Sequence, residues 1–166
     1  TKKIDLINAT GSSPYHRLVV HNNKMYGMTR NGGINNSGVI FEWDPATNIY
    51  TKKIDLSAAN GSNPQGGLLV YNAKMYGTTN YGGINNSGVI FEWDPATNIY
   101  TKKIDLNESN GRGPNGNVVV HNNKMYGMTG AGGGSIIGVG VIFEWDPAIN
   151  KYTRKYNFST PNGRNP

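Results

Sequence analysis

The chain has 166 residues, which is enough for one domain with a hydrophobic core and too few for two of ordinary size. It contains no cysteine, which excludes disulfides, thiolate metal sites and cysteine nucleophiles, and no apolar stretch approaches the roughly 20 residues of a membrane-spanning helix. The net charge of +6 comes from lysines at repeated places such as Lys2-Lys3 and Lys52-Lys53, which we interpret as a solvated rim, so we expect neither a nucleic-acid nor a membrane partner.

A unit of about fifty residues occurs three times. The hexapeptide TKKIDL begins at residues 1, 51 and 101, and GVIFEWDPA begins at residues 38, 88 and 140. Repetition at a fixed period indicates a repeat architecture. We divide one domain, residues 1–166, into repeat units at approximately 15–56, 65–106 and 115–158. Residues 1–6 copy the last strand of the unit and are expected to form an extra outer strand, and a surplus of two residues within 130–140 predicts a tolerant loop.

The second copy begins with a predicted hairpin. The hydrophobic run 67–71 leads through Asn72-Ala73 into residues 74–79, a pattern of two short strands joined by a tight Asn-containing turn. The pair Gly82-Gly83 follows. We interpret it as backbone that needs positive φ rather than as a phosphate-binding loop, because it does not lead into a helix.

Two further strands complete the copy. Residues 88–93 predict a third strand, rich in β-branched and aromatic residues. Residues 94–98 predict a turn, because the proline presets φ and the flanking Asp and Asn side chains can bond back to the backbone. Residues 100–106 predict the fourth strand. We therefore predict an all-β fold, a β-propeller built of four-stranded antiparallel blades with three blade repeats per chain.

These motifs resemble two kinds of propeller repeat. A strand ending in Gly-Gly and an aromatic-rich strand ending in Asp-Pro are similar to a kelch-type blade. The unit resembles more closely the bacterial glycine-rich GloVer repeat, which runs from a Gly and a Pro through a short hydrophobic strand to Tyr-Gly-x-Thr, Gly-Gly and Gly-x-x-Phe. In the second copy those positions are Gly61, Pro64, 68–70, 76–79, Gly82-Gly83 and 88–91. The resemblance covers essentially the whole chain and implies a secreted or cell-surface bacterial propeller with no catalytic residues; we expect no cofactor.

Three units are fewer than the roughly four to eight blades of closed propellers. We therefore expect exposed blade edges that pair with another chain. The predicted partner is a second copy, because two chains related by a two-fold axis form a homodimer with a six-bladed ring. Such a ring has eight outer strands for six blades, so either one outer strand per chain is displaced or the chain is a fragment of a longer repeat protein.

Histidines and carboxylates are the residues most easily mistaken for a catalytic site. His21 and His121 occupy one repeat position that Tyr71 fills in the second copy, so we interpret them as packing residues. Glu42 and Asp44 recur in every copy, and we interpret them as a partner for a repeated lysine and a turn former rather than as the paired carboxylates of a glycosidase. We predict no catalytic residues and no metal ligands.

Candidate ligand-binding residues lie where the copies differ. Residues 32–56 and 82–106 are identical, whereas differences cluster at 7–10, 15–17 and 28–31 with their equivalents. These positions lie at strand ends around the inner strand, where a propeller presents the mouth of its central channel. The candidate mouth residues are Tyr15, His16, Arg17, Arg30, Gln65, Tyr81, Asn115 and Asn117. Drift of loops after recent duplication is the alternative origin of the same differences.

The sequence thus predicts a non-enzymatic propeller module that acts by binding or assembly and oligomerises to complete a ring. Tyrosine faces and amide side chains at the mouth suit a carbohydrate or a peptide, so a lectin-like propeller is the first alternative. A polysaccharide-acting enzyme is the second alternative. It requires a close, unrepeated carboxylate pair at the channel mouth, and this sequence offers none.

Overall fold

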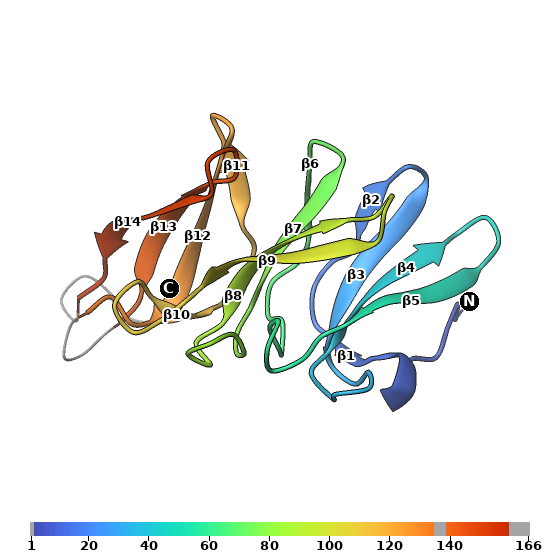
Figure 1. Cartoon of the computed structure of the whole chain (residues 1–166). Coiled ribbons are helices and arrows are strands. Elements are labelled where there is room, and N and C mark those ends of the chain that lie inside the picture. The colour runs from blue at the N-terminus through green and yellow to red at the C-terminus, as the bar shows by residue number, and fades with distance from the viewer. Residues whose placement is uncertain (1, 135–138, 160–166) are drawn as a thin grey trace.

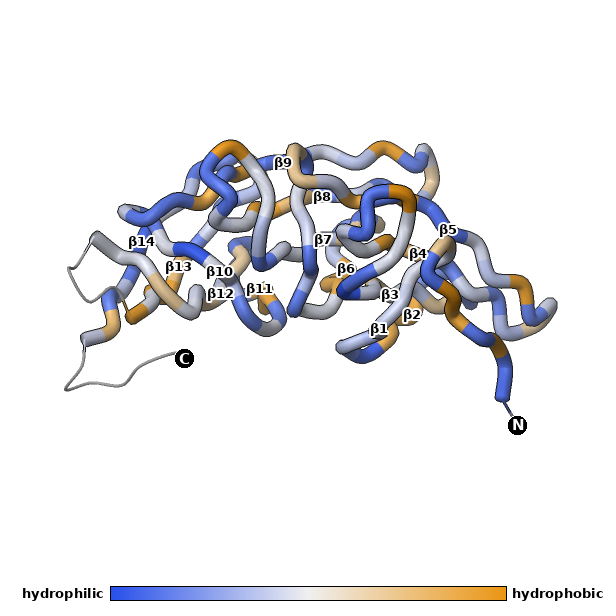
Figure 2. The backbone as a smooth tube through the Cα atoms, turned by 90° about the horizontal axis from the view of Figure 1, so that it is seen from below, coloured by the Kyte–Doolittle hydropathy of each residue, from blue (hydrophilic) through white to orange (hydrophobic). Residues whose placement is uncertain are grey.

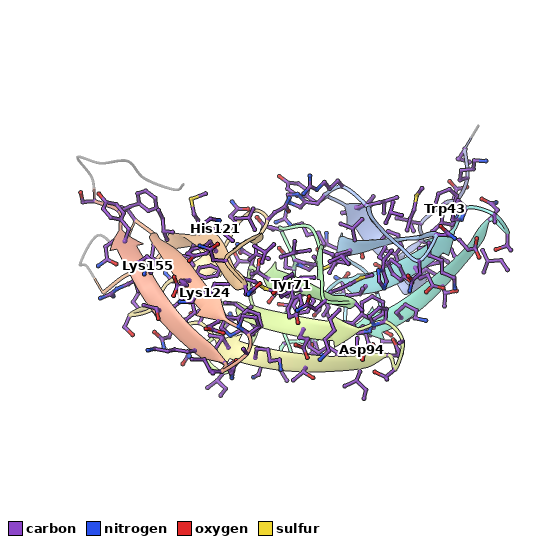
Figure 3. The ribbon with its side chains drawn as sticks, turned by 90° about the horizontal axis from the view of Figure 1, so that it is seen from above. Trp43, Tyr71, Asp94, His121, Lys124 and Lys155 are labelled. Atoms are coloured by element: carbon purple, nitrogen blue, oxygen red, sulfur yellow. The ribbon has the colours of Figure 1, made fainter. Side chains whose placement is uncertain are left out.

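Three antiparallel β-sheets lie side by side in an open arc. The computed structural model describes residues 2–134 and 139–159. In Figure 1 the sheets follow one another along the chain, and Figure 3 shows the arc from above, with the outer strands β5, β9 and β14 along its convex side. Figure 2 shows the same row from below, with short hydrophobic stretches between hydrophilic ones. The predicted all-β architecture of three blades is confirmed.

Each sheet is one repeat unit. The first blade contains β1 (Ser12–Pro14), β2 (Val19–His21), β3 (Lys24–Asn31), β4 (Val39–Asp44) and β5 (Ile49–Asp55), preceded by the 3-10 turn η1 (Asn8–Thr10). The second contains β6 (Leu69–Tyr71), β7 (Lys74–Thr79), β8 (Val89–Asp94) and β9 (Ile99–Asp105). The third contains β10 (Arg112–Pro114), β11 (Val119–His121), β12 (Lys124–Ala131), β13 (Val141–Asp146) and β14 (Lys151–Asn157). The predicted strands are therefore present with bounds shifted by one or two residues.

The innermost strand of the first blade is interrupted. β1 pairs with residues 29–31 of β3 and β2 with residues 24–26 of the same strand, so both lie along one edge. β10 and β11 share β12 in the same way, and in the second blade a single bridge between Ser62 and Tyr81 takes the place of the first half. If the two halves are counted as one interrupted inner strand, each blade is the predicted four-stranded sheet.

The two ends of a blade are built from different turns. The hairpin of β6 and β7, at the top of Figure 1, turns at Asn72 and Ala73, with φ of 49° and 62°. Positive φ at both residues is typical of a type I′ turn, and the predicted tight Asn-containing hairpin turn is confirmed. At the opposite end Gly82 and Gly83 have φ of 82° and 78°, which confirms their interpretation as positive-φ positions. We call these the hairpin end and the glycine-loop end.

The hydrophobic core lies between neighbouring blades. The first boundary buries Tyr26, Met28 and Ile40 against Leu68, Phe91 and Trp93. The second boundary repeats it with Tyr76, Ile90, Val118, Phe143 and Trp145. Because each blade buries its apolar face on the next, stability comes largely from contacts between neighbours, as in other repeat proteins.

The prediction of an extra outer strand at residues 1–6 is wrong for residues 2–6, which form no strand. In the later copies this sequence pairs with the strand just before it, β5 with β4 and β9 with β8. No strand precedes residues 2–6 among the described residues, so this segment lacks the partner that its copies have. The predicted loop at 130–140 is described only in part, because residues 135–138 lie outside the described residues.

Candidate functional site

The three segments that interrupt the innermost strands converge. The N–H of Gly67 donates to Oδ1 of Asn117 at 2.5 Å, and the N–H of Gly116 donates to the carbonyl oxygen of Gln65 at 3.2 Å. A Cβ built on Gly67 would lie 3.7 Å from the Cβ of His16. Three of the predicted mouth residues, from three different blades, thus come to one region.

Arg30 and Gln65 meet at the boundary of the first two blades. Nε of Arg30 and Nε2 of Gln65 both donate to Oδ1 of Asn63, each at 3.1 Å. The Nδ2 of Asn63 in turn donates to Oδ1 of Asn31 at 3.2 Å. These side chains occupy the glycine-loop end of the first boundary.

The corresponding place at the second boundary is a cavity of about 510 Å³. The predicted mouth residues Tyr81 and Asn115 line it, and the Tyr81 residue is 49% exposed. Both the N–H and the carbonyl oxygen of Tyr81 are hydrogen-bonded to the backbone of Ser62, at 3.1 and 2.9 Å. Glu108 and Arg112 also line the cavity and form an ion pair of 2.9 Å.

Tyr15 and Arg17 lie apart from this cavity. Both are exposed, and the Tyr15 ring packs edge-on against the His16 ring with centroids 5.2 Å apart. His16 lines a different cavity of about 280 Å³, which is mostly apolar and includes Leu18 and Trp43. The structure therefore distributes the predicted mouth residues over several places instead of one.

The repeated glutamates pair with lysines at the hairpin end. Oε1 of Glu42 lies 2.7 Å from Nζ of Lys24, and Oε2 lies 3.9 Å from Nζ of Lys53. Burial alone would raise the pKa of Glu42, but hydrogen bonds from Lys24 and Tyr26 and the charge of Lys53 hold the pKa below its usual value. The interpretation of this carboxylate as a lysine partner is confirmed. An ionised, paired carboxylate is a poor general acid.

The other residues considered for catalysis also have structural roles. Oδ1 of Asp44 accepts a hydrogen bond from the N–H of Ala46 at 2.9 Å, which confirms Asp44 as a turn former. The ring of His21 packs on that of Tyr26 with centroids 6.5 Å apart, and Tyr71 and His121 repeat this contact on their own blades. In residues 2–134 and 139–159 no three carboxylate or imidazole groups gather as a metal site would require.

Trp43 lies at one end of the arc (Figure 3) and lacks the contacts of its equivalents. The buried Trp93 packs on Tyr26 with ring centroids 5.7 Å apart, and its indole N–H donates to Oδ1 of Asn98 at 3.1 Å. Trp43 is only partly buried, and its indole N–H has no hydrogen-bond partner among the described residues. The outward face of the first blade, which we call the Trp43 face, thus carries the residues that pack against a preceding blade at the internal boundaries.

The third blade presents the other half at the opposite end. Tyr126 is only partly buried and Met128 is 41% exposed. Their equivalents in the first blade, Tyr26 and Met28, are 4% and 8% exposed, because the second blade covers them. The last blade therefore exposes the side chains that a following blade would bury, and we call this surface the Tyr126 face.

Residues 3–10 lie on the Trp43 face. Nδ2 of Asn48 donates to the carbonyl oxygen of Lys3 at 3.3 Å, as Nδ2 of Asn98 donates to that of Lys53 at 3.4 Å. On the first blade, residues 3–10 thus occupy the position that the end of β5 and the linker after it occupy on the second blade. It does so as an irregular segment followed by η1.

The arrangement of blades defines the protein as a β-propeller. The fold is similar to those of a nidogen/laminin complex, with a TM-score of 0.54 at 14% identity over 86% of this chain and 45% of that one. It is similar to TolB from Acinetobacter baumannii, with a TM-score of 0.53 at 14% identity over 80% of this chain and 29% of that one. The tricorn protease matches with a TM-score of 0.53 at 14% identity over 85% of this chain and 12% of that one. This chain spans less than half of each of these structures, and the likeness is one of fold alone.

The family follows from the sequence of the blades. The model of the Gloeobacter/Verrucomicrobia repeat matches residues 3–166, so the chain belongs to this repeat family. The resemblance to the GloVer repeat is therefore confirmed. None of the curated proteins compared matches the chain. Within the described ranges, no helix has the length and hydropathy needed to cross a membrane.

Proposed function

We propose that this chain is a non-enzymatic propeller module that acts by assembling with blades of its own kind, and that a second copy supplies them. The proposal rests on the aromatic contact that is missing at each end of the arc. Among the described residues, Trp43 has no tyrosine of a preceding blade beside it and Tyr126 has no tryptophan of a following one. At both internal boundaries these positions meet, as Trp93 with Tyr26 and Trp145 with Tyr76.

The two end faces are complementary halves of one boundary. Leu18 is 42% exposed on the first blade, and Val119 is 58% exposed on the third. Because the chain forms this boundary twice internally, a second copy can cover both faces with packing already present in the fold. Two-fold symmetry pairs the Trp43 face of each copy with the Tyr126 face of the other, which creates two identical interfaces and a closed six-bladed ring.

Ring closure also requires a local rearrangement. Ile4 and Leu6 line the apolar cavity on the Trp43 face, and Lys3 is hydrogen-bonded to Asn48 there. The outer strand of an incoming blade takes this same position at the internal boundaries. Residues 2–6 must therefore leave the face when a second copy docks, and the end of β14 of that copy replaces them.

The test is the solution mass of the purified 166-residue chain, measured by light scattering at several concentrations. We expect about twice the 18.0 kDa of one chain. Trp43→Ala should give a monomer with an unchanged far-UV circular dichroism spectrum, whereas Tyr81→Ala, at the internal second boundary, should remain a dimer. A wild-type monomer at every concentration would overturn the proposal.

Carbohydrate binding is the second candidate function. The exposed ring of Tyr81 beside amide side chains favours it. A polysaccharide-acting enzyme has less support, because Glu42 and Asp44 are engaged by a lysine and by a turn. The resemblance to secreted bacterial propellers supports a location outside the cell or at its surface.

A further inference from the structure

The two blade boundaries differ at their glycine-loop ends. At the first boundary Arg30 and Gln65 converge on Asn63 and occupy this end. At the second, Asn80 stands at the position of Arg30, and Gly113 stands at the position of Asn63. Asn80 reaches only the backbone of the third blade, where its Nδ2 donates to the carbonyl oxygen of Pro114 at 3.4 Å, and a cavity of about 510 Å³ is present between the blades.

Differences between the repeat copies gather at this cavity. Residues 32–56 and 82–106 are identical, yet eight lining residues stand where the first boundary has a different residue. They are Asn80, Tyr81, Glu108, Arg112, Gly113, Asn115, Gly130 and Ala131. The lining of this cavity therefore belongs to one boundary and is not the lining that the repeat has at the first boundary.

Tyr81 supplies an aromatic face. Asn31 stands at the equivalent position of the first boundary. The Tyr81 backbone is held by two hydrogen bonds to Ser62, while 49% of the residue is exposed. A ring on a fixed backbone offers its electron-rich face to C–H groups of a ligand at little entropic cost.

Two asparagines from the glycine loop add oriented polar groups. Nδ2 of Asn85 donates to the carbonyl oxygen of Leu106 at 3.0 Å, and Oδ1 of Asn86 accepts from the N–H of Gly82 at 3.0 Å. These bonds fix both side chains. Among the described residues, Oδ1 of Asn85 and Nδ2 of Asn86 have no protein partner. One acceptor group and one donor group therefore lie beside the tyrosine.

The charges in the cavity cancel. Glu108 and Arg112 form an ion pair of 2.9 Å, and the other lining residues are uncharged. A charged ligand would leave one of these charges unbalanced, so the lining favours a neutral ligand with many hydroxyl groups. An aromatic face combined with neighbouring donors and acceptors matches the apolar C–H face and the hydroxyl rim of a pyranose.

We propose that this cavity binds one uncharged pyranose unit of a glycan, stacked on Tyr81, with its hydroxyls bonded to Asn85, Asn86 and the Glu108–Arg112 pair. The proposal rests on the carbohydrate-binding candidate above. It does not depend on ring completion, because both walls of the cavity belong to one chain.

The test is an array of neutral and sialylated glycans, followed by calorimetric titration with glucose, galactose, mannose and N-acetylglucosamine. We expect saturable binding of neutral glycans. Tyr81→Ala should weaken it by about thirty-fold or more, as expected for loss of a central aromatic contact. The double variant Asn80→Arg, Gly113→Asn rebuilds the residues of the first boundary and should abolish binding.

The double variant is compatible with the fold, because Gly113 has a φ of 60° and Asn63 has a φ of 56° at the equivalent position. Tyr15→Ala removes an exposed tyrosine outside the cavity and should leave the affinity unchanged. Absence of neutral-glycan binding, binding of sialylated glycans or peptides only, or full affinity in Tyr81→Ala would overturn the proposal. A monomeric chain that binds neutral glycans would refute ring completion and leave the cavity assignment standing.

Discussion

Trp93 packs edge-on against Tyr26 across the first blade boundary, with ring centroids 5.7 Å apart. The tryptophan comes from β8 and the tyrosine from β3, so the contact joins consecutive blades. The pair recurs as Trp145 with Tyr76 at 5.8 Å. An aromatic pair at every boundary gives each blade the same way of adding a neighbour, and it leaves one unpaired half at each end of the arc.

Substitution of Trp93 by Ala should destabilise the fold by about 3–5 kcal/mol, because it empties a fully buried site in the core. Trp43→Ala at the equivalent end position should cost markedly less, since that side chain is only partly buried. Urea unfolding of both variants, at concentrations where each is monomeric, measures the difference. Equal losses would mean that the Trp43 face is already covered by a blade.

Removal of residues 1–6 should strengthen self-association. The truncation takes Ile4 and Leu6 away from the Trp43 face and breaks the hydrogen bond between Asn48 and Lys3, both of which compete with an incoming blade. Sedimentation velocity on the full and truncated chains compares their dissociation constants, which we expect to fall by about tenfold. Weaker association after truncation would show that this segment is part of the interface instead of its competitor.

Ala73→Asn should stabilise the chain by about 0.5–1 kcal/mol. Ala73 has a φ of 62°, a left-handed conformation that costs energy for alanine and that asparagine tolerates better. Asn23 and Asn123 occupy the same turn position with φ of 60° and 61°. Chemical denaturation measures the gain, and the reverse change Asn23→Ala should cost a similar amount. No change in either variant would contradict the strain argument.

Acid should weaken the fold through the glutamates at the hairpin end. Hydrogen bonds from Lys124 and Tyr126, helped by the charge of Lys155, lower the pKa of Glu144 from 4.5 to about 2. Because the folded-state pKa is the lower one, this carboxylate stabilises the fold above about pH 4.5, and the contribution is lost as the pH falls towards 2. Glu92 acts in the same direction, since its pKa is also lowered.

The measurement is the melting temperature by circular dichroism between pH 2 and 7. Glu144→Gln should melt lower than the wild type at neutral pH and lose less on acidification, because its side chain does not titrate. Glu108→Gln, at an exposed ion pair, is the control and should keep the wild-type slope. An unchanged acid dependence in Glu144→Gln would assign the acid sensitivity to other groups.

The sequence by itself determined the blade, because the blade is built from short-range patterns. Alternating strands, the Asn72-Ala73 turn, the positive φ of Gly82 and the Asp44 turn all depend on residues a few positions apart. Near-identical copies then adopt the same local structure three times, so the blade count and strand order followed from the repeat. The pairing of Glu42 with a repeated lysine was predictable for the same reason.

Only the tertiary structure decided what lies between the blades. Whether Arg30 reaches Asn63, and whether Asn80 and Gly113 leave a cavity instead, depends on side chains that meet from blades about fifty residues apart. Residues 2–6 carry strand sequence but form no strand, because the copy of this sequence in β5 pairs with the preceding β4 and no strand precedes residues 2–6 among the described residues. A periodic sequence specifies its repeats locally, whereas sites at boundaries and ends depend on which neighbour is present.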